Sequence, residues 1–148
     1  MTTIAYKDGI LAADTQLTYT DDTYGHCHKI IKLVNGMVVA SSGDSLKDFW
    51  LMKYLQGEKI PKNKMNFKGV HAIIIDDGKV FVTYGTADLL PMEDKFYACG
   101  SGMRIARGAM YYGLGAKDAV KFASEVDIYT NNIVDVYDTK REKITYGK

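Results

Sequence analysis

Three dipeptides of one kind, Asp8-Gly9, Asn35-Gly36 and Asp77-Gly78, each stand between two apolar runs of strand length. Asp-Gly and Asn-Gly accept the positive φ angles that a two-residue type I′ hairpin requires. The sequence therefore predicts three antiparallel hairpins, with strands over residues 2–6 and 10–15, 29–34 and 37–42, and 71–76 and 79–84. Several of these runs are apolar at successive positions, which is typical of strands covered on both faces.

Helical patterns separate the hairpins. Asp44 or Ser45 can cap a helix that runs to about Gln56, and Gly57 can end it. Its expected apolar face consists of Leu46, Phe49, Trp50, Met52 and Leu55. Two further helices are expected, from about residue 102 to 112 and over 116–126, followed by short strands at 133–137 and 143–146. This order predicts one α+β domain over residues 1–148, with two packed sheets and helices outside them.

Composition excludes several classes of function. The net charge is +1, which gives no strong electrostatic footprint for nucleic acid or an anionic membrane. No apolar run approaches the roughly 18 residues that span a bilayer. Cys27 and Cys99 are far apart and form no CxxC pair, which favours a reducing compartment. The start of the chain lacks the pattern of a signal peptide, so we expect a cytoplasmic protein.

Thr2 is the first residue of chemical interest, because a small residue at position two permits removal of Met1. The mature chain would then begin with a threonine whose hydroxyl lies beside its own α-amino group. That amine has an ordinary pKa of about 8, so it can act as a base near neutral pH without a histidine. Taken alone, Thr2 is better explained as the start of a β-strand, because threonine at position two is common.

Three other residues stand at the ends of the first four predicted strands, which we expect to form adjacent hairpins, so that these ends can converge near Thr2. Asp14 ends the second predicted strand, Lys29 begins the third, and Gly43 follows the fourth. A lysine near the threonine would lower the pKa of its hydroxyl, and an aspartate would hold that lysine charged. The Gly43 amide, at a strand-to-helix turn, could donate to a developing oxyanion. Each residue alone has an ordinary structural role, and only the combination points to catalysis.

Six segments in order resemble the proteasome β-subunits and the bacterial protease HslV, which are N-terminal nucleophile hydrolases. The segments are Thr2-Thr3-Ile4, Leu11-Ala12-Ala13-Asp14, His28-Lys29-Ile30-Ile31-Lys32-Leu33, Ala40-Ser41-Ser42-Gly43-Asp44, Cys99-Gly100-Ser101-Gly102 and Asp127-Ile128-Tyr129-Thr130-Asn131. Each segment is weakly specific, but six in the family's order and near its spacing are strongly specific. The resemblance spans nearly the whole chain.

The resemblance implies a four-layer αββα sandwich and a threonine-type endopeptidase. Thr2 would be the nucleophile, Lys29 would tune it, and Asp14 would orient Lys29. Gly43 would form the oxyanion hole. The remaining positions implied by the resemblance are Ser101 and Asp127, which would set the hydrogen bonding of the terminal amine, and Ser41 and Thr18, which would approach the first substrate pocket.

The resemblance also implies an assembly state and a substrate class, and the chain departs from the family's pattern at one helix. A homo-oligomeric ring acting on peptide or unfolded protein is expected, with no required cofactor and with a structural cation near Asp127 and Thr130 as a minor expectation. The family usually has two long helices after the oxyanion turn, and here only one fits before the lysine-rich segment 57–70, which is expected to be a solvated loop. The second helix is expected to be missing or reduced to a turn, which argues against docking of an ATPase unfoldase.

Two motifs and the chain as a whole each allow a competing interpretation. Gly100-Ser101-Gly102 is similar to a glycine-rich nucleotide-binding loop. However, the acidic residue that such a site needs on a strand about 20 residues later is missing from the sequence. His26 and His28 supply only two metal ligands, so no metal site is predicted. The alternative that stays open for the whole chain is a proteasome-like structural or adaptor protein without catalysis.

Overall fold

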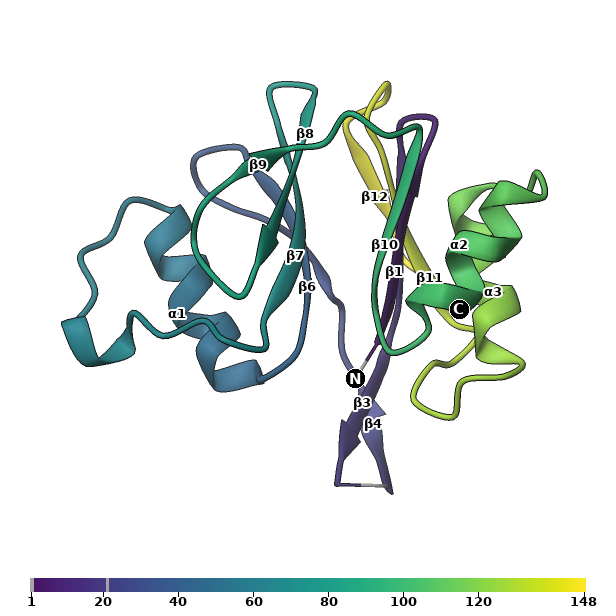
Figure 1. Cartoon of the computed structure of the whole chain (residues 1–148), viewed down its shortest axis with the longest axis horizontal. Helices are drawn as coiled ribbons and strands as arrows, with labels where there is room; N and C mark the ends of the chain where they lie inside the picture. Colours follow the sequence, from purple (N-terminus) through teal and green to yellow (C-terminus); the bar gives the residue numbers. More distant parts are fainter. Residues whose placement is uncertain (1, 21) are drawn as a thin grey trace.

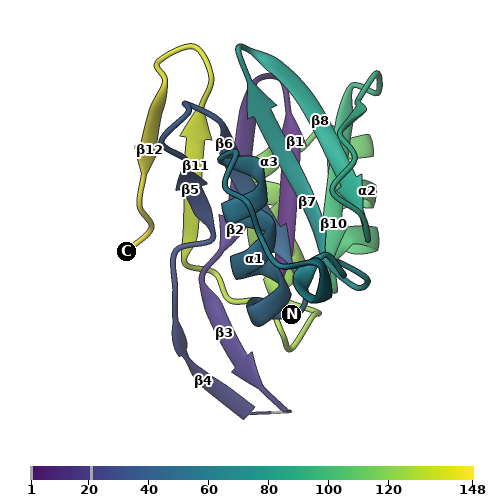
Figure 2. The ribbon, with the colours of Figure 1, turned by 90° about the vertical axis from the view of Figure 1, so that its left-hand side faces the viewer.

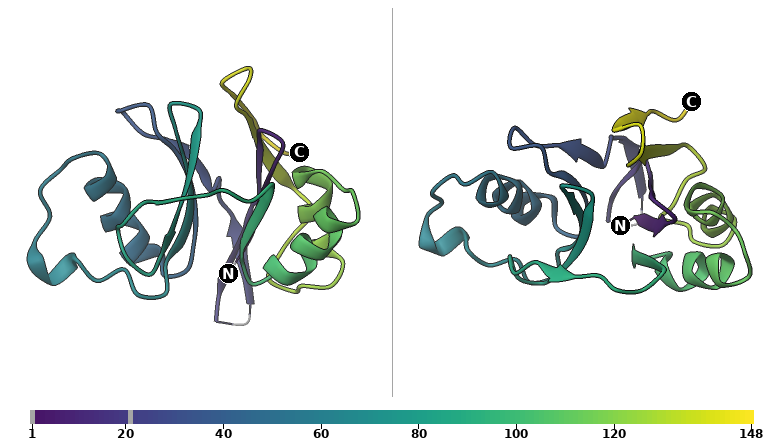
Figure 3. Two further views of the ribbon diagram at one scale, coloured as in Figure 1. Left: turned by 45° about the horizontal axis from the view of Figure 1, so that its top comes forward. Right: turned by 90° about the horizontal axis from the view of Figure 1, so that it is seen from above.

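The computed structural model describes residues 2–20 and 22–148. Two five-stranded antiparallel sheets face one another, and helices cover the outer side of each (Figure 1). Seen from above, the order of layers is one helix, two sheets, and then a pair of helices (Figure 3). The four layers agree with the αββα arrangement that the sequence motifs imply.

The first sheet has the order β10-β1-β2-β11-β12 and the second the order β5-β6-β7-β8-β9, while β3 and β4 form a separate hairpin that projects from one end (Figure 2). The strands are β1 Thr3–Lys7, β2 Ile10–Asp14, β3 Gln16–Tyr19, β4 Asp22–His26, β5 Ile30–Lys32, β6 Val38–Ser42, β7 His71–Asp76, β8 Lys79–Tyr84, β9 Leu90–Pro91, β10 Phe96–Gly100, β11 Val134–Asp138 and β12 Lys143–Thr145. The helices are α1 Ser45–Leu55, α2 Met103–Tyr111 and α3 Ala116–Ser124.

All three predicted hairpins are present, but one of their turns differs from the prediction. Both residues of the Asp8-Gly9 turn have positive φ, as a type I′ turn requires. At the Asn35-Gly36 turn only Gly36 has a positive φ. A backbone hydrogen bond between Leu33 and Met37 closes this longer turn. The Asn35 side chain instead donates to the Leu55 carbonyl at the end of α1, at 2.8 Å. The turn therefore ties the hairpin to the helix.

Side chains of the central strands alternate between two different cores. In β1, Ile4 packs between the sheets while Ala5 packs under α2 and α3. In β7, Ile73 packs between the sheets while Ile74 packs under α1. This two-sided burial is what the uninterrupted apolar runs predict.

Helix α1 begins as predicted, with the Asp44 side chain accepting hydrogen bonds from the amides of Leu46 and Lys47. Its predicted apolar face is partly wrong. Leu46 is 66% exposed and Phe49 is 50% exposed, and the buried side chains are Leu51, Met52 and Leu55. Among the described helices only α1 is a long helix that covers the second sheet, so side chains on its outer side, such as Leu46 and Phe49, lie in solvent.

The segment between α1 and β7 contains one short 3₁₀ helix, Lys62–Lys64, and no second long helix. Its lysines are exposed or nearly so, as a solvated loop requires. The loop prediction is nevertheless wrong for Phe67 and Val70, which are buried in the core under α1. None of the described helices has the length and apolar character that crossing a bilayer requires.

Candidate active site

The predicted catalytic residues meet at the ends of strands that belong to two different sheets. Thr2 precedes β1 and Asp14 ends β2 in the first sheet, whereas Lys29 precedes β5 and Gly43 follows β6 in the second. The sequence predicted that these strand ends converge but treated the two hairpins as neighbours. They converge instead because the facing sheets bring their ends together.

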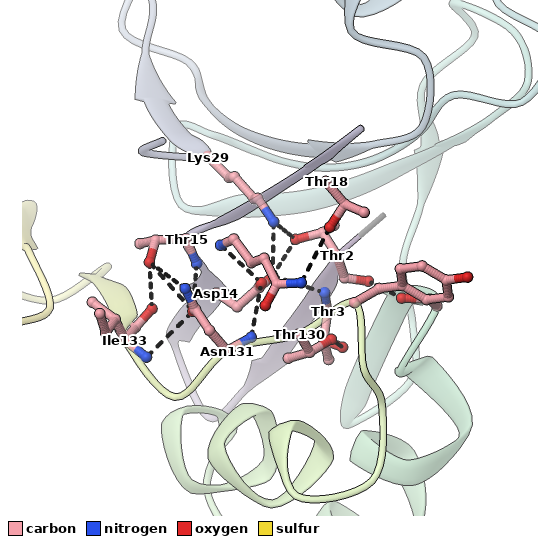
Figure 4. A network of polar contacts seen from close by, with 12 residues as sticks. Thr2, Thr3, Asp14, Thr15, Thr18, Lys29, Thr130, Asn131 and Ile133 are labelled. Carbon is pink, nitrogen blue, oxygen red and sulfur yellow. Dashed lines mark hydrogen bonds and ion pairs between the residues drawn. The ribbon is translucent and has the colours of Figure 1, made fainter. Parts of the chain in front are cut away.

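Asp14 is the centre of the polar network (Figure 4). Its side chain is fully buried and accepts hydrogen bonds from the backbone amides of Thr3 at 3.0 Å, Gln16 at 3.1 Å and Asn131 at 3.3 Å. A buried carboxylate needs such donors because it has lost its water. Three backbone segments therefore fix the position of this carboxylate.

Lys29 lies between Asp14 and Thr2. Its Nζ is 2.9 Å from Asp14 Oδ1 and also donates to the Thr2 hydroxyl oxygen, and the Thr2 hydroxyl in turn donates to Asp14. Burial lowers the pKa of Lys29 from its ordinary value, and the nearby Asp14 carboxylate opposes that shift. A cation beside a hydroxyl favours the alkoxide form, so the arrangement suits an activated threonine nucleophile.

Ser101 and Asp127 lie on the other side of Thr2. The Ser101 hydroxyl is 3.3 Å from the Thr2 carbonyl oxygen and 2.6 Å from Asp127 Oδ2. Asp127 also accepts from the Thr130 hydroxyl at 2.6 Å and from the Tyr129 amide at 3.2 Å. Their expected role toward the terminal amine stays a prediction, because the Met1 side of that nitrogen lies outside the described residues. The cation expected near Asp127 and Thr130 also stays a prediction.

Two glycines at the site allow close packing of the backbone, Gly43 against Gly69 and Gly100 against Thr2. Gly43 has a φ of +120°, and a Cβ added there would lie 2.1 Å from the Gly69 carbonyl oxygen. Gly100 has a φ of +94°, and its added Cβ would lie 1.8 Å from the Thr2 carbonyl oxygen. Both positions therefore require glycine for two reasons, backbone conformation and space.

We expect Gly43→Ala to destabilise the protein by about 3 kcal/mol or more, because left-handed strain adds to a clash with rigid backbone. Gly57→Ala is the matched control, because Gly57 also has a positive φ but its added Cβ would meet nothing within 4 Å. This control is expected to cost about 1 kcal/mol. Urea unfolding of both variants measures the difference, and equal losses would show that the contact with Gly69 is unimportant.

A pocket opens beside Thr2 and Gly43. Thr18 from β3 and Ser41 from β6 both line it, and their expected contact with substrate stays a prediction. Asp48 of α1 also lines it and was not anticipated. The position of Asp48 in the pocket wall could not be predicted from the sequence, because it depends on how α1 packs against the sheet.

Two further residues with polar contacts near the site, Asn131 and Asp135, were missed at the sequence level. Asn131 stands inside a quoted motif, but its contacts with Asp14 and with Thr15 were not foreseen. Asp135 is fully buried, lies 2.7 Å from His28 Nδ1 and accepts from the Gly147 amide at 2.8 Å. A lone acid between two valines of a predicted strand is the signal that could have revealed it.

No model of a known protein family matches the sequence. Solved structures match it over nearly its whole length. BPH from Thiobacillus denitrificans has a TM-score of 0.68 and 20% identity, covering 99% of this chain and 98% of that one. The same protein in complex with epoxomicin gives a TM-score of 0.69 with the same identity and coverage. HslV from Trypanosoma brucei gives a TM-score of 0.69 at 16% identity, covering 98% of each chain.

These matches define the class of fold, which is that of N-terminal nucleophile hydrolases. Within that class, the chain has the proteasome β-subunit and HslV type of fold, as its six sequence segments predict.

Proposed function

We propose that this protein is a threonine peptidase that cleaves peptide bonds with Thr2 after removal of Met1. The observation that supports this most strongly is the contact of the Thr2 hydroxyl with both Lys29 and Asp14. Lys29 and Asp14 are nearly or fully buried, and Thr2 forms part of the pocket wall. A nucleophile, a cation and an orienting carboxylate are thereby held beside a space that can receive a substrate.

In the proposed reaction, Thr2 Oγ1 attacks the carbonyl carbon of the peptide bond. The hydroxyl proton passes to the free α-amine of Thr2, directly or through water, and then to the departing amine as the carbon–nitrogen bond breaks. This leaves the acyl group as an ester on Thr2. Water then attacks the ester, giving up a proton to the same amine, and the threonine hydroxyl is restored.

The remaining site residues stabilise the negative charge that develops during the reaction or hold the reacting groups in position. The Lys29 ammonium stabilises the developing alkoxide, and Asp14 keeps that ammonium in place. The Gly43 amide donates to the tetrahedral oxyanion, a contribution that typically changes the rate by about a hundredfold to a thousandfold. Ser101 and Asp127 orient the α-amine once it is free.

The proposal extends to assembly and substrate. A homo-oligomeric ring would enclose the sites and admit peptide or unfolded protein. Because residues 45–70 of the described chain contain one long helix, α1, over the second sheet, the protein offers a reduced surface on that side for an ATPase unfoldase. BPH forms a complex with epoxomicin, so a related epoxyketone is the natural probe for this chain.

The test of the proposed function is intact-protein mass spectrometry before and after treatment with a peptide epoxyketone. Loss of Met1, followed by one added inhibitor mass located at Thr2, is expected. Retention of Met1 would count heavily against the peptidase, and an unlabelled Thr2 in a protein lacking Met1 would exclude it. Either result would favour the structural or adaptor protein instead.

We expect the rate of Thr2 labelling to fall at alkaline pH as Lys29 loses its proton. Because burial lowers the pKa of Lys29, the midpoint should lie below 10.5, with activity present below it and lost above it. Asp14→Asn removes the charge that opposes this shift, so the midpoint should move to lower pH. Lys29→Arg is the control, because a guanidinium does not titrate in this range and the alkaline limb should disappear. A midpoint unchanged by Asp14→Asn would contradict the assigned coupling.

A further inference from the structure

The pocket beside Thr2 contains one acidic side chain, that of Asp48 in the first turn of α1. The Ser41 hydroxyl donates to its Oδ1. Among the described residues no lysine, arginine or histidine forms an ion pair with it. Two basic residues, Lys29 and His28, also line this pocket, and each is already paired with another acid, Asp14 and Asp135 respectively. Within the described part of the chain, the pocket therefore has a negative group with no cationic partner.

This carboxylate lies where a cation would stabilise it. Burial raises the pKa of Asp48, while the hydrogen bond from Ser41 acts against that shift. A positive group brought into the pocket would compensate for the lost hydration of the anion. The apolar side chains of Leu17 and Ile31 also line the pocket. Such walls suit the methylene stem of a lysine or arginine side chain.

We propose that Asp48 makes this pocket select a lysine or arginine side chain on the residue just before the cleaved bond. The proposal rests on the proposed peptidase function, because it is the attack by Thr2 that places the substrate. The acyl part of the substrate stays bonded to Thr2, so its nearest side chain is the one that reaches the adjoining pocket. Asp48 then acts as a specificity-determining residue.

The test compares fluorogenic peptides that differ only at this residue, with arginine, lysine, leucine or aspartate. For the wild-type protein, kcat/KM is expected to be highest for arginine and lysine. Asp48→Asn keeps the size of the side chain and an acceptor for Ser41 but removes the charge. It should lower kcat/KM for arginine about 30-fold and leave that for leucine nearly unchanged. A leucine preference in the wild type, or an equal loss for all peptides, would overturn the proposal.

Two matched variants separate the charge from other effects. Asp48→Glu keeps the charge and should retain the preference for arginine. Asp44→Asn removes a charge from the start of the same helix, but Asp44 does not line the pocket and asparagine is also a good helix cap. It should leave the preference unchanged. A shift in preference as large as that of Asp48→Asn would mean that the general charge of the helix start matters, and would overturn the role of Asp48.

A binding measurement keeps failure of the specificity distinct from failure of the peptidase. In Thr2→Ala, calorimetry with acetylated peptides ending in argininamide or leucinamide reports on the pocket without turnover. Tighter binding of the arginine peptide, lost in Thr2→Ala/Asp48→Asn, supports the selectivity even if no peptide is cleaved. Equal binding of the two peptides, together with epoxyketone labelling of Thr2, overturns the selectivity and leaves the peptidase standing.

Discussion

Thr2→Ala is expected to abolish peptide cleavage, reducing the rate to that of the uncatalysed background. Alanine lacks the hydroxyl that the proposed reaction needs, and no other group can form the ester at that position. The variant should still lose Met1, because alanine is also small, so the chain start remains comparable. The fold should survive, with a loss of about 1 kcal/mol from the hydrogen bonds of the hydroxyl. Fluorogenic peptide assays and urea unfolding measure the two effects.

Thr2→Ser is the conservative control and should keep cleavage and labelling, since it retains a hydroxyl beside the α-amine. Turnover that persists in Thr2→Ala would place the nucleophile elsewhere. Cys27, which lines the same pocket, would then be the first residue to test, and Thr2→Ala/Cys27→Ala would decide.

Lys29→Ala is expected to reduce cleavage by roughly a thousandfold or more. A unit charge next to a developing anion contributes on the order of 4 kcal/mol at a partly buried site, which corresponds to that factor. Stability should fall by about 2 kcal/mol, because Asp14 loses its ionic partner but keeps three backbone donors. The protein should therefore remain folded, and circular dichroism together with urea unfolding checks this.

Lys32→Ala is the matched control for Lys29→Ala. Lys32 lies on β5 close to Lys29 in sequence, and its side chain is exposed. Its removal takes away the same charge from the chain but not from the site, so cleavage should stay near the wild-type rate. Normal turnover in Lys29→Ala would remove the lysine from the mechanism.

Local patterns in the sequence were enough to predict most of the hairpins and helices of the fold. The Asp-Gly turns correctly placed two hairpins along the chain, because only a few residues accept the backbone angles of such turns. The hairpin of β3 and β4 was missed, because no glycine marks its turn, where Thr20 takes a positive φ of 55°. The apolar face of α1 was misjudged, because apolar residues occur all around that helix and do not reveal which side meets the sheet.

The candidate site was predictable in its residues but not in its geometry. Thr2, Asp14 and Lys29 were chosen from chemistry and from resemblance, and the structure brings all three into contact. The contributions of Asn131 and Asp48 depend on how loops and a helix from separate layers meet. Such contacts between distant segments leave no local pattern in a single sequence.

The hydrogen bonds from backbone amides to Asp14 make the geometry of the site depend on the folding of the whole domain. Two of the amides that hold its carboxylate, those of Thr3 and Asn131, come from separate segments of the chain, whereas Gln16 is only two residues from Asp14. The carboxylate keeps the Thr3 and Asn131 donors only while these segments remain docked. Amide exchange at Thr3 and Asn131 should therefore require global opening rather than local fraying. A denaturant should abolish activity over the same concentration range in which it unfolds the domain.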